Sequence, residues 1–328
     1  MKPIEFSSIK FKILQKLKKE IIISGEEIAK SVKISRSAVW KWIKILRKDG
    51  YIIKGSPKKG YFFAGGKERL LPEEIHKPKM KKFFKNIYFL KKVSSTMDLA
   101  KKLAEEGKSE GTIVIAEIQT SGRGRLGREW ISPSGGIYFS IILRPKISPI
   151  DAPKINLMAS VAVAESIKKL YNLNVKTKWP NDVLINDKKV SGILIELACE
   201  VDRIKWVILG IGINANTDRR FIKKIENATS LKLELKRKVS IVELMNVVLE
   251  KLKREYTDLK HRRFKRILSK WKKLSSTLKK DVKIITPEGV ILGKAVDVSP
   301  RGALLLKLKT GIIKEIYTGD CIHLRKTN

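Results

Sequence analysis

The sequence predicts a multidomain α+β protein, and three changes of pattern along its 328 residues support this fold class. The first part has helical periodicity and ends in a short basic hairpin. From Phe83 the pattern alternates between strands and helices, and after Asp281 only short strands separated by turns follow. A chain of this length that is 43% hydrophobic can bury more than one core, which favours several domains.

Composition excludes some classes of protein and leaves others open. The net charge of +38 is spread along the whole chain, so it supports a nucleic-acid partner only weakly. No uncharged apolar run is long enough to span a bilayer, and the start lacks a signal-peptide pattern, so we expect a cytoplasmic protein without a membrane partner. Cys199 and Cys321 have no metal-ligand spacing, so we expect buried thiols and no metal site built from side chains.

Residues 1–64 predict two helices joined by a tight turn and followed by a hairpin. Ser24 and Glu27 have the spacing of a capping box, which marks the start of the first of these helices. Ser35 is the expected N-cap of the second helix, which runs to a stop at Gly50. Strand, basic turn and strand then follow as a wing. The first 64 residues therefore predict a winged helix-turn-helix.

The second of these helices has two different faces. Val39, Ile43 and Leu46 form its buried stripe, which leaves a basic face that would suit the major groove of DNA. The alternative is a docking domain whose basic face is only solvated, and Trp40 could equally belong to the core. The candidate DNA-binding residues on the helix and the wing are Arg36, Ser37, Trp40, Lys41, Lys44, Lys58 and Lys59.

Residues 65–82 contain two adjacent glycines, two prolines and many charges, which predicts a linker. Ile87–Val93 then predicts the first strand of a second domain. Ser95 is the expected N-cap of a helix over Thr96–Ala104, and free hydroxyl and N–H groups at such a helix start can form a polar binding corner. The alternative is that Ser95 is only a cap.

A loop with three glycines and three arginines, Gly122–Arg128, is the expected centre of the chemistry. Thr112–Ile118 predicts a strand leading into it through Gln119, and Ile137–Leu143 predicts the antiparallel neighbour, which places the loop at a sheet edge. Its G-x-G-x-x-G pattern lacks the following helix of a dinucleotide site. Planar arginine charge suits a phosphate or carboxylate. A solvated basic loop or an RNA-binding tract remains the alternative.

The rest of the second domain predicts further sheet and helix elements. Asp151–Tyr171 is apolar enough for a helix buried beneath the sheet. Lys176–Ile185 and Lys188–Glu196 predict a hairpin with its turn at Asn186-Asp187. Trp206–Asn214 predicts a central strand whose glycines leave room for a ligand.

That hairpin brings a carboxylate and an ammonium towards a common site, through Asp182 and Lys189. The alternative is a surface ion pair, which contributes little. From Ser240 to about Leu278 the chain is helical and basic, which completes a domain over residues 83–278. Residues 279–328 predict a small β-barrel without signs of catalysis.

Taken in order, these motifs resemble the bifunctional biotin–protein ligases that also repress the biotin operon. The resemblance covers essentially the whole chain: winged helix-turn-helix, a central mixed sheet with helices of the biotin/lipoate ligase type, and an SH3-like C-terminal barrel. The motifs that carry it are Ser95-Thr96, Gln119 with Gly122–Arg128, Trp179–Asp182, Lys189 with Gly192, and Gly210–Asn214.

The resemblance implies a two-step ligase that needs ATP, biotin and Mg²⁺ carried by the nucleotide. Biotin and ATP would form biotinyl-5′-AMP and pyrophosphate, and the biotinyl group would then pass to a lysine of a biotin carboxyl carrier protein. It also implies that the adenylate acts as a corepressor by favouring a homodimer that binds operator DNA. The glycine–arginine loop would be loose when empty and ordered over the ligand.

The resemblance also assigns roles to individual residues. The implied catalytic residues are Lys189, Asp182 and Arg125. The implied biotin contacts are Ser95, Thr96, Met97, Gln119, Arg123, Gly124, Arg125, Trp130, Lys189 and Gly192. The implied adenylate contacts are Arg123, Arg125, Arg128, Asn181 and Asn214. Many family members carry Asn where this chain has Met97, so the amide side chain that could hydrogen-bond to biotin is replaced there by a thioether.

Two other functions stay open from the sequence. A lipoate–protein ligase would resemble the same fold and use similar adenylate chemistry, although Gln119 and the loop with Trp130 favour biotin. A ligand-sensing transcription factor without ligase activity is the second alternative, and the presence of Asp182 and Lys189 argues against it.

Overall fold

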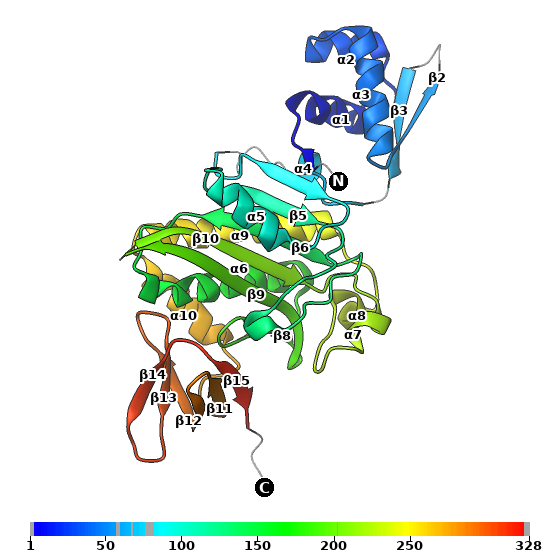
Figure 1. Ribbon diagram of the computed structural model, residues 1–328. Coiled ribbons are helices and arrows are strands. Elements are labelled where there is room, and N and C mark those ends of the chain that lie inside the picture. The colour runs from blue at the N-terminus through cyan, green and yellow to red at the C-terminus, as the bar shows by residue number, and fades with distance from the viewer. Residues whose placement is uncertain are drawn as a thin grey trace.

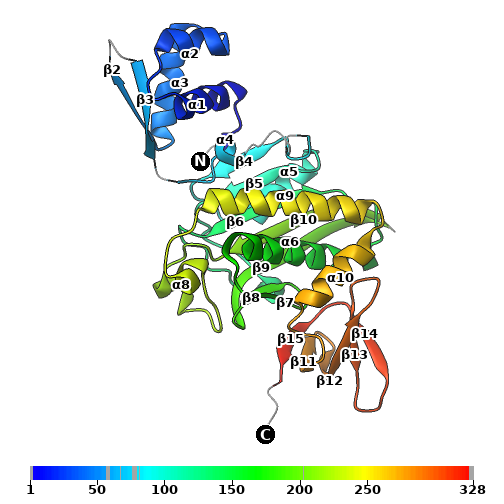
Figure 2. The same cartoon turned by 180° about the vertical axis from the view of Figure 1, so that it is seen from behind.

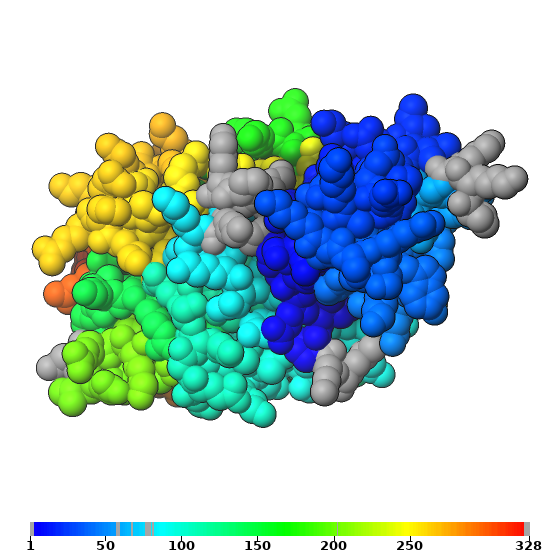
Figure 3. All heavy atoms as spheres, turned by 90° about the horizontal axis from the view of Figure 1, so that it is seen from above, coloured from blue at the N-terminus to red at the C-terminus, as the bar shows by residue number. Residues whose placement is uncertain are grey.

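The computed structural model describes residues 3–56, 60–66, 68–75, 80, 82–201 and 203–324. Three parts follow one another along the molecule: a helical N-terminal domain, a large central sheet with helices, and a small β-domain (Figure 1). Viewed from above, the N-terminal domain stands to one side of the central domain (Figure 3). Among the described residues, no helix combines the length and apolar character needed to cross a membrane.

The N-terminal domain has the predicted helices and hairpin. Its elements are α1 (Ser8–Lys19), α2 (Gly25–Val32), α3 (Arg36–Lys48), β2 (Tyr51–Ser56) and β3 (Gly60–Gly66). The predicted capping box is confirmed, because Ser24 accepts a hydrogen bond from the Glu27 N–H while the Glu27 carboxylate accepts from the Ser24 N–H. Ser35 caps α3 as predicted. β2 and β3 pair antiparallel to form the wing.

Two short elements connect this domain to the central sheet. β1 (Ile4–Glu5) pairs antiparallel with β4 (Ile87–Leu90), so the chain touches the central sheet before it enters the N-terminal domain. The segment expected to be a linker contains the helix α4 (Pro72–Ile75) and buries Leu70, Leu71 and Ile75. Its described part is therefore a packed connection rather than a bare spacer.

Buried ion pairs hold this junction together. The ammonium of Lys10 in α1 lies 2.5 Å from Asp49 Oδ2 and 3.1 Å from Glu73 Oε2, and all three side chains are less than a tenth exposed. Arg69 lies 2.7 Å from the Glu117 carboxylate of the central domain and donates to the carbonyl of Asp49 at 3.2 Å. Charges from both domains therefore share one desolvated interface.

The central sheet has eight strands in the order β1-β4-β5-β6-β10-β9-β8-β7. The further strands are β5 (Ile113–Ala116), β6 (Ile137–Leu143), β7 (Val175–Lys178), β8 (Asp182–Ile185), β9 (Lys188–Glu200) and β10 (Arg203–Ile213). Only β4 and β5 run parallel among these pairs, so the sheet is mixed, as predicted. β10 is an interior strand, which confirms its predicted central position.

Helices cover the two faces of the sheet unequally. α6 (Pro153–Tyr171), α9 (Ile241–Lys260) and α10 (Phe264–Leu274) lie together on one face (Figure 2). α6 is largely buried there, as its apolar sequence predicts. α5 (Thr96–Glu105) lies on the opposite face, and the short helices α7 (Arg219–Ile222) and α8 (Leu231–Leu235) follow β10. The face beside α5 is left open for a ligand.

Two predictions about this domain were wrong in part. Lys176–Ile185 is not one strand, because β7 ends at Lys178 and β8 begins at Asp182 after a turn that contains a cis Trp179–Pro180 peptide. Proline has no N–H for a strand ladder, which explains the break. The turn at Asn186-Asp187 is confirmed, with φ of 50° and 59°. The glycine–arginine loop follows interior strands, so it lies at their ends rather than at a lateral sheet edge.

The C-terminal domain is a small antiparallel sheet, as the turn signals predict. Its strands are β11 (Asp281–Thr286), β12 (Gly289–Val298), β13 (Leu304–Lys307), β14 (Ile313–Ile316) and β15 (Asp320–His323). Their order is β14-β13-β12-β11-β15. Cys321 is buried here as expected, whereas Cys199, near the end of β9, is exposed, so the prediction of a buried thiol was wrong for Cys199.

Candidate functional site

A cavity of about 1230 Å³ lies between the open face of the central sheet, the glycine–arginine loop and the C-terminal domain. Nearly all ligand-contact residues predicted from the sequence line it. The predicted residues in its wall are Ser95, Thr96, Met97, Gln119, Arg123, Gly124, Arg125, Arg128, Trp130, Asn181, Asp182, Lys189 and Gly192. Residues from four separate stretches of the chain therefore meet in one place.

One end of the cavity is a polar corner whose wall contains Ser95, Thr96 and Gln119, and Ser132 and Ser140 hydrogen-bond to Gln119 and Thr96 from behind that wall. Gln119 Oε1 accepts from the backbone N–H of Thr96 at 2.8 Å and from its hydroxyl at 3.0 Å. Gln119 Nε2 donates to Ser132 Oγ at 2.9 Å, and the Thr96 and Ser140 hydroxyls lie 2.8 Å apart. Ser95 caps α5 as predicted. The corner is thus a pre-ordered set of amide and hydroxyl groups.

Three glycines on β9 and β10 form the floor beside this corner. A Cβ added to Gly212 would lie 2.4 Å from Trp130 Nε1, and one added to Gly192 would lie 2.8 Å from the same indole. A Cβ on Gly210 would lie 2.7 Å from Met97 Sδ. The glycines make room for Trp130 and Met97, which supply an apolar wall next to the polar corner.

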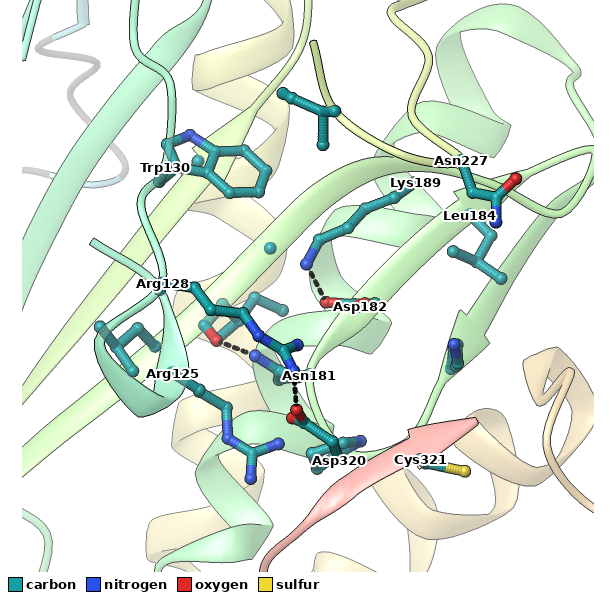
Figure 4. A pocket seen from close by; sticks show the side chains of 18 of the residues that line it. Arg125, Arg128, Trp130, Asn181, Asp182, Leu184, Lys189, Asn227, Asp320 and Cys321 are labelled. Atoms are coloured by element: carbon teal, nitrogen blue, oxygen red, sulfur yellow. Dashed lines mark hydrogen bonds and ion pairs between the residues drawn. The ribbon is translucent and has the colours of Figure 1, made fainter. Parts of the chain in front are cut away.

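Lys189 and Asp182 face each other across the hairpin of β8 and β9. The Lys189 ammonium lies 2.6 Å from Asp182 Oδ1, and the ammonium is 5.4 Å from the centre of the Trp130 ring (Figure 4). Both side chains are mostly buried, at 29% and 19% exposed. Close to them, Asn181 Nδ2 donates to the carbonyl of Ile193 at 2.6 Å. The pair is therefore part of the cavity wall and not a pair on the outer surface.

Arg123 is held by two carboxylates. Its guanidinium contacts Glu196 through Nε at 2.8 Å and through Nη2 at 3.1 Å, and Asp98 through Nη1 at 2.5 Å. The hydrogen bonds to Glu196 and then to Asp98 raise the pKa of Arg123 above its ordinary value. Arg123 therefore keeps its charge, and a direct contact with a ligand would compete with both carboxylates.

The other two arginines of the loop reach the C-terminal domain. Arg125 donates to the carbonyl of Gly319 and to the hydroxyl of Thr318, each at 3.2 Å, and Arg128 pairs with Asp320 (Figure 4). Burial lowers the pKa of Arg125 from its ordinary value. The loop closes the cavity by bridging two domains.

The C-terminal domain contributes more to the site than the sequence predicts. Asp320, Cys321 and His323 from β15 line the cavity, as do Lys279 and Lys280 before β11. Burial raises the pKa of the Cys321 thiol to about 12, so the thiol stays protonated near neutral pH. These residues follow ordinary turns, and nothing in their local sequence marks them as part of a site.

Asn214 is placed differently from the other predicted contacts. It is 1% exposed and does not belong to the cavity wall formed by the described residues. Its backbone N–H donates to the Val190 carbonyl, and its own carbonyl accepts from Leu231. A contact between its side chain and adenine therefore stays a prediction.

The predicted DNA-binding face of α3 is exposed. Arg36, Ser37, Lys41 and Lys44 point away from the core, and Trp40 is 49% exposed with the Lys44 ammonium 3.6 Å from its ring centre. Trp40 therefore belongs to the surface and not to the core. Lys58 and Lys59 lie outside the described residues.

Comparison with known families matches each part of the chain separately. Residues 10–62 match an HTH domain, residues 89–214 match the biotin/lipoate A/B protein ligase family, and residues 277–324 match the biotin protein ligase C terminal domain. Among solved structures, a biotin protein ligase from Aquifex aeolicus in complex with biotin and ATP has a TM-score of 0.64 at 35% identity. It covers 74% of this chain and 100% of its own.

Curated relatives match across all three parts. The bifunctional ligase/repressor BirA of Bacillus spizizenii is 37% identical over 302 residues, which are 91% of this chain and 93% of that protein. The protein of the same name from Escherichia coli is 32% identical, with 92% of each chain covered. Because the three family matches occur in one order and the identity extends over nine-tenths of both chains, this chain belongs to the bifunctional ligase/repressor family of biotin–protein ligases.

Proposed function

We propose that the chain is an ATP-dependent biotin–protein ligase that also acts as a DNA-binding repressor. The observation that carries the ligase proposal is the single cavity that joins three features. These are the polar corner around Gln119, the apolar wall of Trp130 and Met97, and the Lys189–Asp182 pair. Such a cavity can take a ligand with a polar head, an apolar tail and a reacting carboxylate in that order.

In the first step the biotin carboxylate oxygen would attack the α-phosphorus of ATP. The new bond is the acyl-phosphate bond of biotinyl-5′-AMP, and the bond to pyrophosphate breaks. The ureido group would be bonded by the polar corner, and the tail would pack on Trp130. Lys189 would stabilise the negative charge that develops on the oxygens around the α-phosphorus. Arg125 and Arg128, closing the loop against the C-terminal domain, would keep water away from the adenylate.

Mg²⁺ would be bound chiefly by phosphate oxygens of the nucleotide. Among the described residues, no group of three or more His, Cys, Asp and Glu side chains could hold a metal ion, and two of the carboxylates that line the cavity, Asp182 and Asp320, are each paired with a cation. This donor set fits an ion that arrives with the triphosphate. When bound, it would neutralise charge on the leaving pyrophosphate.

In the second step a lysine amine of the acceptor protein would attack the acyl carbon of the adenylate. The amide bond forms, AMP leaves, and the amine loses a proton. Asp182 would orient the incoming amine and receive that proton, since its carboxylate faces the cavity. The acceptor would be a biotin carboxyl carrier protein, since two relatives of the chain are named biotin–[acetyl-CoA-carboxylase] ligase.

Pyrophosphate release with biotin and ATP tests the first step. We expect release with the wild type, and Lys189→Ala should lower its rate by about two to three orders of magnitude because charge at the reacting phosphate loses its partner. Lys188→Ala is the matched control, since Lys188 is exposed, begins the same strand and does not line the cavity. An unimpaired Lys189→Ala enzyme would remove Lys189 from the mechanism.

Transfer to an acceptor tests the substrate. The intact mass of a carrier domain should rise by one biotinyl group when biotin, ATP and the enzyme are present. A parallel reaction with lipoate should leave the mass unchanged. A lipoyl product would favour a lipoate–protein ligase over the proposed activity.

The repressor proposal rests on the exposed basic face of α3 in a domain that matches an HTH family. The adenylate would act as corepressor by favouring a homodimer, which requires that it bind the dimer more tightly than the monomer. Operator binding should be stronger with biotinyl-5′-AMP than without it in a gel-shift titration. Equal affinity in both conditions would contradict the switch.

A further inference from the structure

The turn that precedes Asp182 is held from the C-terminal domain. We infer that Thr277 and His323 are positioning residues for Asp182 in the transfer of biotin. The inference rests on the proposed function, because it concerns the carboxylate that would receive the acceptor lysine. Both residues would act through the position of Asp182 and not by placing a charge on the reacting atoms.

Thr277 contacts the backbone of the turn directly. The N–H of Trp179 donates to Thr277 Oγ1 at 3.0 Å, and both residues are buried, at 1% and 0% exposed. The same hydroxyl lies 3.1 Å from His323 Nε2 on β15. No strand ladder supplies a partner for this N–H, because β7 ends at Lys178. A buried N–H without a partner is costly, so this hydroxyl matters to the turn.

The hydroxyl of Thr277 can serve both of its partners at once. The hydroxyl accepts from Trp179, so it can donate its own proton to His323. Burial, together with the nearby charges of Lys178 and Lys280, lowers the pKa of His323 to about 4. The imidazole is then neutral near pH 7, and its Nε2 can accept that proton. The contacts therefore run from the Trp179 N–H through the Thr277 hydroxyl to His323 Nε2.

Further bonds fix the turn on either side of this contact. The N–H and the hydroxyl of Ser276 both donate to the Thr177 carbonyl, at 2.8 Å and 3.1 Å. On the other side, Asn181 exchanges bonds with Ile193 of β9, at 2.6 Å through its side chain and 3.0 Å through its carbonyl. Asp182 follows immediately. Its carboxylate is therefore aimed by a turn that is fixed at both ends.

This arrangement makes the C-terminal domain a part of the site. Thr277 is the first residue of the segment that matches the C-terminal family, and His323 lies in its last strand. The domain therefore contributes in two ways. It closes the cavity through Arg125 and Arg128, and it holds the turn before Asp182 through Thr277.

Substitution of Thr277 separates positioning from binding. Thr277→Val keeps the shape of the side chain and removes both hydrogen bonds. In single-turnover transfer from preformed adenylate, we expect its rate to fall about tenfold, which corresponds to about 1.4 kcal/mol of transition-state stabilisation. KM for biotin and ATP in pyrophosphate release should change less than about twofold. Thr277→Ser keeps the hydroxyl and should restore transfer to near the wild-type rate.

A second measurement does not depend on any substrate. Hydrogen exchange at the Trp179 amide should be faster in Thr277→Val than in the wild type and slow again in Thr277→Ser. A melting temperature close to that of the wild type in both variants checks that the fold survives. If Thr277→Val fails to fold, His323→Leu, which leaves the contact between Thr277 and Trp179 in place, should show a smaller loss of the same kind.

The outcomes distinguish this inference from the proposed function. Wild-type transfer rates in Thr277→Val, or an equal loss in Thr277→Ser, would overturn the positioning role. A wild-type protein that releases no pyrophosphate with biotin would contradict the ligase proposal. In that case unchanged exchange at Trp179 in Thr277→Val would separately overturn the role of Thr277 in holding the turn.

Discussion

At the scale of single residues, the site depends on glycines, which have no side chain, as much as on the large side chains that pack over them. Gly192, Gly210 and Gly212 have no Cβ where the indole of Trp130 and the thioether of Met97 lie. The apolar wall is therefore built from two large side chains and three glycines together. A side chain added at one of these glycines would therefore displace Trp130 or Met97 as well as disturb the strand.

Gly212→Ala should weaken biotin binding. Its new methyl group would lie 2.4 Å from Trp130 Nε1, so the indole must move. Overpacking of this kind costs about 1–3 kcal/mol, and if the whole cost falls on the bound state the biotin affinity is lower by about five- to 160-fold. Calorimetric titration with biotin measures it. Gly25→Ala is the control, because its added methyl would meet Tyr61 at an ordinary 3.4 Å in the N-terminal domain.

His323 should make stability depend on acid pH. Its folded-state pKa of about 4 lies below the ordinary 6.5 because burial, Lys178 and Lys280 disfavour the charged form. The unfolded chain then binds the proton more readily. The stabilisation is fully present above about pH 6.5 and is lost as the pH falls through 4. His323→Gln should flatten the melting temperature over this range. An unchanged slope would show that His323 contributes nothing to it.

At the scale of elements, the junction between α1, α3 and α4 is set by charge. Lys10 pairs with both Asp49 and Glu73 in a site that is almost closed to solvent. Burial raises the pKa of Glu73, which shows the cost of its charge, while Lys10 acts in the opposite direction. The charge of one residue on α1 therefore supports carboxylates from two other elements.

Lys10→Met should destabilise this junction strongly. It leaves two buried carboxylates without their cation, and loss of one partner of a buried ion pair costs about 3–5 kcal/mol. Urea denaturation followed by tryptophan fluorescence would measure the change in the free energy of unfolding. Lys12→Met, at an exposed position of the same helix, should leave it within about 0.5 kcal/mol of the wild type.

Sequence patterns predicted elements where local signals were complete. The capping box at Ser24, the N-cap at Ser95 and the turn at Asn186-Asp187 follow from side chains within a few positions of one another. The division of Lys176–Ile185 into two strands was missed, although Pro180 gave a local reason for it. Element boundaries depend on such single residues and are less predictable than the elements.

Only the part of the candidate site that the central domain contributes was predictable from the sequence. The residues of the central domain carry motifs, and the structure brings those residues to one cavity, with Asn214 outside its wall. The partners of the loop arginines, Glu196 and Asp320, could not be predicted because they are set by tertiary packing across long sequence separations. An ion pair between residues far apart in the chain leaves no periodic pattern in the sequence from which it could be predicted.

At the scale of the whole molecule, the proposed DNA-binding face of α3 and the cavity lie in different domains. Charge removal on α3 should therefore alter DNA binding without altering ligation. Lys41→Gln combined with Lys44→Gln should lower the slope of log affinity against log salt by about two, if each lysine neutralises one phosphate. Fluorescence anisotropy with duplex DNA at several salt concentrations measures the slope.

The matched control for that measurement is Lys12→Gln with Lys19→Gln, since both positions are exposed on α1. This pair should leave the slope within about half a unit of the wild type. Pyrophosphate release should be equal in all these proteins. A normal salt slope in the α3 variant would place the DNA contact elsewhere on the molecule.

The short strand β1 gives the DNA-binding domain two attachments to the body of the protein. Ile4 and Glu5 pair with Phe89 and Tyr88, and the chain returns after the wing through α4. A single tether permits free swivelling, whereas two neighbouring anchor points resist torsion. In a homodimer, the separation between the two recognition helices would then be dictated by how the ligase domains associate. The distance between the two half-sites of an operator would therefore report how the two ligase domains are arranged in the dimer.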